Sequence, residues 1–193
     1  DVIDDGDTSI GTLTEGTGNG KGVYTMTGLR VGTYLVKETK APDGFDPDEN
    51  TYKAVITTDG QTVEIENEAG KGFANSPKKG SITLTKVNKN NPDDKLSGAI
   101  FDVYKDENDN GVIDEGDTSM GTLTEGTGDN KGVYTMSGLR IGTYLVKETK
   151  APDEFNLDTN TYKAVIANDG DAITIENEIG KGFVNTPKSG TIT

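Results

Sequence analysis

The sequence predicts an all-β protein built from tandem β-sandwich domains. Apolar side chains alternate with polar ones at a period of two, and clusters of Gly, Pro, Asn and Asp separate these segments. No stretch has the 3.6-residue periodicity of a long amphipathic helix. About seven short strands fall within about 110 residues, which is typical of a β-sandwich.

An internal repeat is the third observation behind this fold class. Residues 1–83 align with residues 111–193 at a fixed offset of 110, and only 22 of the 83 aligned positions differ. The last four residues, GTIT, realign with GSIT at Gly80, so one unit spans about 110 residues. A unit of that length is a domain, which favours a string of separate domains over a solenoid of short repeats.

The repeat divides the chain into three parts. We expect residues 1–79 to be a repeat without its N-terminal strands, residues 80–189 to be a complete repeat, and residues 190–193 to begin a further one. The linker at residues 75–80 is short and contains Pro77, which stiffens it. Neighbouring units are therefore expected to form an extended rod.

The strands of the complete repeat follow from the alternation. The first covers residues 81–87, and the second has Ala99, Phe101 and Val103 on one face. Further strands are expected at 133–136, 141–148, 161–166, 172–176 and 182–185. Turn sequences separate them at 91–94, 127–132, 151–153 and 168–170.

Three polar residues occupy positions that should face the core. Lys86, Glu148 and Asn185 each alternate in step with the apolar residues of their own strand. Buried polar groups are costly unless they satisfy one another, so the three are expected to meet. Asn177 also alternates in step with apolar neighbours, at Ile173 and Ile175, and is the alternative to Asn185.

Composition and charge exclude several classes of function. The chain carries 33 acidic and 19 basic residues, and a net charge of −14 repels nucleic acid and anionic membranes. No run reaches the roughly 18 apolar residues of a membrane span. The chain has no Cys and no His, which excludes disulfides, thiolate zinc sites and the commonest general base. We therefore do not expect an enzyme that acts on an external substrate.

Four ordered motifs carry a resemblance to a known family. GSITLTKVN (80–88), LSGAIFDVY (96–104), GTYLVKETKAP (142–152) and FVNTPKSG (183–190) resemble the Cna B-type repeat. This repeat is the prealbumin-like, inverse-immunoglobulin sandwich of Gram-positive surface adhesins and pilins. The resemblance covers the complete repeat and the matching part of the first one. It implies an extracellular stalk or shaft module of a cell-wall-anchored protein.

The resemblance also implies a self-made isopeptide bond. The matching positions are Lys86 on the first strand, Asn185 on the last strand and Glu148 as the assisting acid. In the first repeat the counterparts are Glu38 and Asn75, and no residue of this sequence matches the lysine.

The chemistry of these side chains agrees with that reading. Burial lowers the pKa of a lysine and raises that of a glutamate, and a neutral amine is a nucleophile. A protonated Glu148 would polarise the Asn185 carboxamide and pass a proton to the departing ammonia. The competing interpretation is a buried ion pair between Lys86 and Glu148 without a covalent bond.

The acidic segment 106–117 fits the spacing of a calcium loop, with Gly111 at its sharp turn. Its expected ligands are Asp106, Asn108, Asn110, the carbonyl of Val112, Asp114 and Asp117. Oxygen-only donors suit a hard cation, and the competing interpretation is a solvated acidic hairpin. The first repeat keeps only Asp4 and Asp7 of this set and should bind calcium poorly.

These features together predict a structural function. We expect a rod-forming stalk or pilus-like fibre, stiffened by isopeptide bonds and calcium, whose partners are neighbouring repeats. Other domains of the same protein would contact the host extracellular matrix. We expect this segment neither to bind nucleic acid nor to insert into a membrane. The alternative is an adhesin module that itself binds a host matrix protein or glycan.

Overall fold

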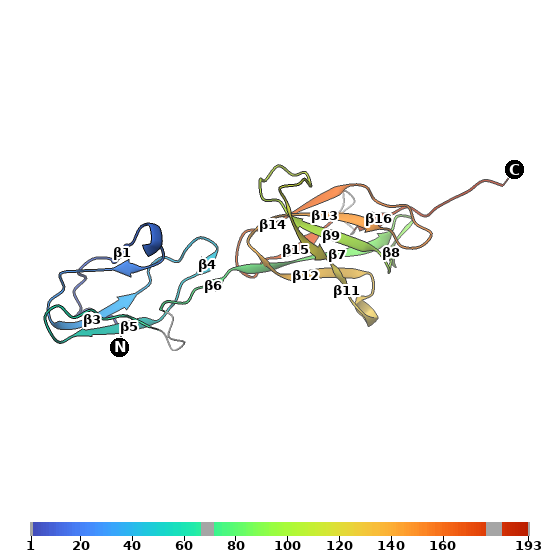
Figure 1. Ribbon diagram of the computed structural model, residues 1–193. Coiled ribbons are helices and arrows are strands. Elements are labelled where there is room, and N and C mark those ends of the chain that lie inside the picture. Colours follow the sequence, from blue (N-terminus) through green and yellow to red (C-terminus); the bar gives the residue numbers. More distant parts are fainter. Residues whose placement is uncertain (1, 67–71, 177–182, 193) are drawn as a thin grey trace. The chain divides into compact units, whose positions relative to one another are not determined.

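The computed structural model describes residues 2–66, 72–176 and 183–192, and divides into two compact units, Asp1–Ser76 and Pro77–Thr193 (Figure 1). The all-β fold class is confirmed, because the described elements are strands and two single-turn 3₁₀ helices. The elements that precede the second unit's first long strand are, in chain order, β1 (Thr14–Glu15), η1 (Gly18–Gly20), β2 (Tyr24–Thr25), β3 (Gly32–Lys37), β4 (Phe45–Asp46), β5 (Thr51–Ile56) and β6 (Ser76–Pro77).

The second unit contains longer strands that form a two-layer sandwich. They are β7 (Lys79–Asn88), β8 (Asn91–Lys95), β9 (Ile100–Lys105), β10 (Thr118–Thr122), β11 (Thr124–Glu125), η2 (Gly128–Asn130), β12 (Val133–Arg140), β13 (Gly142–Lys150), β14 (Thr161–Ile166), β15 (Ala172–Ile175) and β16 (Phe183–Asn185). One sheet has the order β10-β9-β13-β14, and the other has the order β11-β12-β7-β15, with β8 and β16 also paired to β7. Figure 1 shows these strands overlying one another in two layers.

The core of the second unit lies between the two sheets. Its buried apolar side chains come from both layers, with Ile82 and Leu84 on β7 facing Phe101 and Val103 on β9. Phe101 also packs edge-on against Tyr134, with ring centroids 5.0 Å apart. The alternation seen in the sequence therefore orients these strands as expected, since every second side chain enters the core.

Strand β7 connects most of its sheet, because its two halves pair with different strands. Its N-terminal half pairs in parallel with β15, and its C-terminal half pairs in parallel with β16. In the second pairing Phe183 lies opposite Lys86, and Asn185 lies opposite Asn88. The first and last strands of the unit are thus direct neighbours that run in the same direction.

Three strands of the second unit differ from the sequence expectation. Residues 91–94 were expected to be a turn, but they belong to β8, and the turn lies just before them. Strands β10 and β11 have no counterpart in the expectation, because all five residues of β10 are exposed without apolar alternation and β11 has only two residues.

Strands of the first unit pair as their counterparts in the second unit do, but their side chains are more exposed. Strand β3 pairs with β5 in the register that β13 and β14 use. Tyr24 is 54% exposed, whereas its counterpart Tyr134 is 1% exposed. Tyr134 is covered by the segment around Leu96 and Ala99, to which its hydroxyl bonds, and no residues of the first unit align with that segment.

Candidate functional site: a buried lysine, glutamate and asparagine

Three strands bring the predicted reactive residues together in the core of the second unit. Lys86 comes from β7, Glu148 from β13 in the facing sheet, and Asn185 from β16. The exposed fractions of these residues are 0%, 0% and 2%. Their alternation with apolar neighbours therefore predicted both their burial and their meeting.

Glu148 contacts the other two side chains with different oxygens. Lys86 Nζ lies 3.3 Å from Oε1 of Glu148. The Asn185 Nδ2 group donates to Oε2 of the same carboxyl, at 2.8 Å. The carboxyl group consequently bridges the amine that would attack and the amide nitrogen that would leave.

The surroundings of Lys86 favour its neutral form. Its Nζ lies 4.5 Å from the ring centroid of Phe183 and 5.9 Å from that of Phe101. Burial lowers the pKa of Lys86 to about 8, against the attraction of Glu148 and Asp158, which raises it. About a tenth of this side chain is therefore uncharged at pH 7, far more than for a lysine with an ordinary pKa, and this neutral fraction is nucleophilic.

Three buried polar atoms make no well-aligned hydrogen bond within the described residues: Lys86 Nζ, Glu148 Oε1 and Asn185 Oδ1. The first two satisfy each other as an ion pair at 3.3 Å, so Asn185 Oδ1 is the member of this group left without a partner, which is rare for a buried polar atom. The strand register supports isopeptide formation, because Asn185 lies two residues beyond Phe183, on the face that Lys86 shares.

The segment that holds Glu148 and Asn185, residues 156–158, was not among the site residues predicted from the sequence. The backbone N–H of Asp158 donates to Glu148 Oε2 at 2.7 Å, and the carbonyl oxygen of Asn156 accepts from Asn185 Nδ2. The side chain of Asp158 in turn accepts from Asn160 and from the hydroxyl of Tyr162. The pattern Asp-x-Asn-x-Tyr occurs in both repeats, at 48–52 and 158–162, and is the signal that could have located this segment.

The first unit contains the same arrangement without a lysine. Asn75 Nδ2 donates to Glu38 Oε2 and to the Asp46 carbonyl oxygen, and Asp48 N donates to Glu38 Oε2 at 2.7 Å. Glu38 and Asn75 are half-buried. The alternative bonding residue, Asn177, lies outside the described residues.

The loop between β9 and β10 holds the predicted calcium ligands, and it projects beyond the strands of its sheet (Figure 1). Asp106 is buried and accepts from the N–H groups of Asn110 and Gly111. Asp117 accepts from the N–H of Asp114 at 3.0 Å. Asn108 lies close enough to donate its amide to Asp114 at 3.3 Å.

The proposed ligands in this loop are all oxygen atoms, the donor type that a hard cation such as calcium prefers. The ligands proposed from the sequence are three carboxylates, two amides and the Val112 carbonyl, all of which offer oxygen. Among the described residues, no three His, Cys, Asp or Glu side chains converge closely enough to hold a metal ion. The first repeat keeps the end of the loop, where Asp4 N donates to Asp7 and Gly6 N donates to Asp4.

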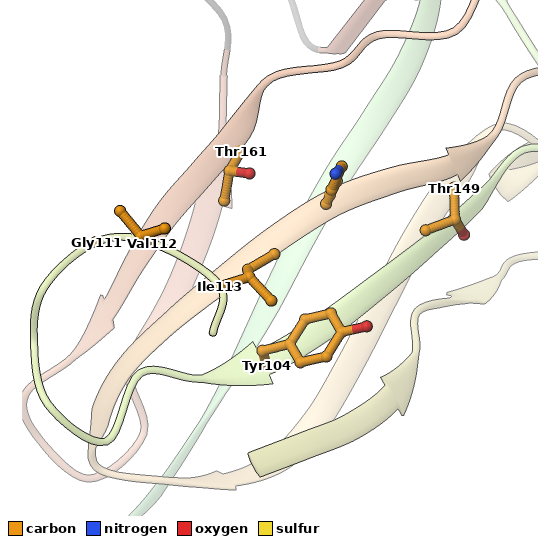
Figure 2. A pocket seen from close by; sticks show the side chains of 7 residues that line it. Tyr104, Gly111, Val112, Ile113, Thr149 and Thr161 are labelled. Atoms are coloured by element: carbon orange, nitrogen blue, oxygen red, sulfur yellow. The ribbon is translucent and has the colours of Figure 1, made fainter. Parts of the chain in front are cut away.

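A shallow depression lies between this loop and the outer surface of the sheet. Figure 2 shows Ile113 of the loop beside Tyr104 of β9, with Thr149 and Thr161 on the neighbouring strands. Its lining contains no buried acid–base pair, which distinguishes it from the Lys86 cluster. Separately, the described residues include no helix long and apolar enough to cross a membrane.

Comparison with solved structures finds similarity to a Bacillus protein and to two pilins. The Bacillus anthracis TIE protein is 25% identical, with a TM-score of 0.62 over 82% of this chain and 26% of that one. A streptococcal ancillary pilin is 23% identical over 83% of this chain and 43% of that one, with a TM-score of 0.41. BcpA, the major pilin subunit of Bacillus cereus, is 25% identical over 64% of this chain and 36% of that one, with a TM-score of 0.40. The chain thus spans less than half the length of each.

Comparison with sequence families gives the assignment. No curated protein matches the chain. The family described as the SpaA prealbumin-like fold domain matches residues 2–69 and residues 80–179, which together are most of both units. This agrees with the resemblance of the motifs to the prealbumin-like Cna B-type repeat. The chain therefore belongs to the SpaA prealbumin-like fold domain family.

Proposed function

We propose that this chain is a structural segment of a cell-surface fibre whose complete repeat closes itself with an isopeptide bond between Lys86 and Asn185. The observation that carries the proposal is the buried contact of Glu148 with both of these side chains. Membership of the prealbumin-like family supports the structural role, and similarity to the Bacillus anthracis TIE protein supports the fold. The fibre would lie outside the cell, with neighbouring repeats as its partners.

The reaction follows from the contacts of Glu148. Lys86 first loses one proton to solvent, and its neutral Nζ, which lies 3.3 Å from Glu148 Oε1, attacks Cγ of Asn185. The new C–N bond forms as the second proton of the amine passes through Glu148 to Nδ2 of Asn185. The Cγ–Nδ2 bond then breaks, and one ammonia molecule leaves. Because the fold holds the two groups together, their effective concentration is high and no external catalyst is needed.

The position of this bond suits a fibre under tension. Strands β7 and β16 are parallel neighbours, so a force that pulls the ends of the unit apart shears one strand along the other. Hydrogen bonds alone would carry that shear in the absence of a crosslink. A covalent bond from Lys86 to Asn185 would transfer the force past almost the whole domain.

Calcium is a second proposed stabiliser of the fibre. Asp106, Asn108, Asn110, Asp114 and Asp117 would hold the ion together with the carbonyl of Val112. The ion would replace the N–H groups that now satisfy these carboxylates, such as Gly111 N on Asp106. It would fix the loop above the sheet without taking part in the isopeptide reaction.

Intact mass spectrometry tests the covalent bond. The chain is expected to be about 17 Da lighter than its sequence, which corresponds to one lost ammonia molecule. Lys86→Ala and Glu148→Ala should each restore the full mass, whereas Glu38→Ala, the matched change in the first repeat, should leave the deficit in place. A wild-type chain of full mass would contradict the proposal and would leave Lys86 and Glu148 as an ion pair.

A further inference from the structure

A second polar cluster lies beside the reactive residues and has no part in the chemistry described above. Its centre is Asp158, whose Oδ1 accepts from the backbone N–H and the side-chain amide of Asn160, at 2.9 and 2.8 Å. The Asp158 Oδ2 atom accepts from the Tyr162 hydroxyl at 2.7 Å. We call Asp158, Asn160 and Tyr162 the Asp158 cluster.

The Asp158 cluster fixes one end of a segment that touches both halves of the reactive site. The Asp158 N–H donates to Glu148 Oε2, and two residues earlier the Asn156 carbonyl accepts from Asn185 Nδ2. The other end of the segment is held to the chain after β16, because Asn156 N donates to Thr186 O at 2.9 Å. The segment is therefore anchored on both sides, and its two contacts orient the carboxyl and the carboxamide toward each other.

The first unit shows that this arrangement does not depend on the lysine. Asp48 accepts from Asn50 at 2.9 Å and from the Tyr52 hydroxyl at 2.8 Å, as Asp158 does from its own partners. The Asp48 N–H donates to Glu38. These contacts form although no residue of the chain aligns with Lys86 for this repeat. The ion pair with the lysine is thus not what organises the acceptor side of the site.

The two oxygens of Glu148 are consequently in different environments. Oε2 accepts two N–H groups, from Asp158 and from Asn185, which occupy its lone pairs. Oε1 has no hydrogen-bond partner among the described residues and faces Lys86. A proton taken from the amine therefore enters the carboxyl group at Oε1. The charged groups that face this carboxyl are Lys86, at 3.3 Å, and Asp158, through its N–H.

We propose that Asp158, held by Asn160 and Tyr162, is a positioning residue for isopeptide formation. It directs Oε2 of Glu148 to the leaving nitrogen of Asn185 and keeps Oε1 available to Lys86. This inference rests on the proposed function, since it concerns the rate of the same reaction. It adds that the contacts on Glu148 and Asn185 form independently of the ion pair with Lys86.

Reaction rates of the full chain test the proposal. Each variant is made by cell-free translation, and the fraction that has lost ammonia is followed by intact mass from the moment synthesis stops. Asp158→Ala should react about tenfold or more slowly than wild type, since small displacements of reacting groups carry large rate penalties. Asp158→Asn, which keeps an acceptor for Asn160, should stay within about threefold of wild type. Tyr162→Phe should fall between them, because it keeps the ring on Phe183, at 4.4 Å, and loses only the hydroxyl bond.

The controls separate positioning from folding and from the proposed function. Tyr52→Phe, the matched change in the first repeat, should react at the wild-type rate. The folded fraction of every variant is measured by amide hydrogen exchange in a Glu148→Gln background, where no bond can form. Wild-type rates in Asp158→Ala, or slowing only in proportion to the lost folded fraction, would overturn the positioning role. A wild-type chain that never loses ammonia would instead contradict the proposed function.

Discussion

Lys86 is the residue whose protonation state controls the proposed reaction. Its amine lies among the rings of Phe101 and Phe183, and burial lowers its pKa to about 8. Only the neutral amine attacks, so the rate of ammonia loss follows the fraction of Lys86 that is deprotonated.

The first prediction concerns the pH dependence of that rate. Because the pKa of Lys86 is about 8 in the folded chain, the ammonium dominates at pH 6 and the amine dominates at pH 9. The rate should therefore rise roughly tenfold per pH unit below that pKa and level off above it. Intact mass after timed incubation at each pH measures the profile. A rate that is constant from pH 6 to 9 would show that deprotonation of Lys86 does not limit the reaction.

At the scale of strands, the bond would join β7 to β16 and close a loop of about 100 residues. A crosslink over a loop of that length stabilises the folded state by about 4–5 kcal/mol through restriction of the unfolded chain. Glu148→Gln keeps the shape of the side chain and removes the proton acceptor. We expect this variant to lose stability of that order in guanidinium unfolding, and the matched Glu38→Gln to lose much less. Equal stability of wild type and Glu148→Gln would contradict the crosslink.

The loop between β9 and β10 gives a second prediction at this scale. Isothermal titration of the chain with calcium should show one site, and Asp106→Ala should abolish it, because this buried carboxylate is the first of the expected ligands. Asp4→Ala, in the first repeat, should leave the titration unchanged, since that repeat keeps only the last part of the loop. No heat of binding at millimolar calcium would leave segment 106–117 as a solvated hairpin.

The strands show what alternation can and cannot predict. It located β7 and β13, and with them the burial of Lys86 and Glu148, because a period of two fixes which side chains enter the core. It missed β8, since residues 91–95 have a turn-like composition and pair only with one end of β7. It also missed Asp158, which lies between strands, where no periodicity indicates the direction of a side chain.

At the scale of the whole molecule, the isopeptide bond would make the complete repeat resist extension. A force applied to the ends of the second unit enters through β7 and leaves through β16. In single-molecule pulling, the wild-type unit should not release the residues between Lys86 and Asn185. Glu148→Gln should release about 100 residues, or roughly 340 Å at about 3.4 Å per residue. Release of that length from the wild type would contradict a stalk closed by a covalent bond.

Peptide mapping is the sharpest test for the isopeptide bond, because it identifies the two residues that are joined. Proteolysis of the intact chain followed by tandem mass spectrometry should yield one branched peptide that links Lys86 to Asn185, lighter by about 17 Da than the sum of its two parts. A branch from Lys86 to Asn177 would move the bond to the neighbouring segment. Linear peptides alone, with Lys86 and Asn185 unmodified, would contradict the isopeptide and reduce the buried cluster to an ion pair.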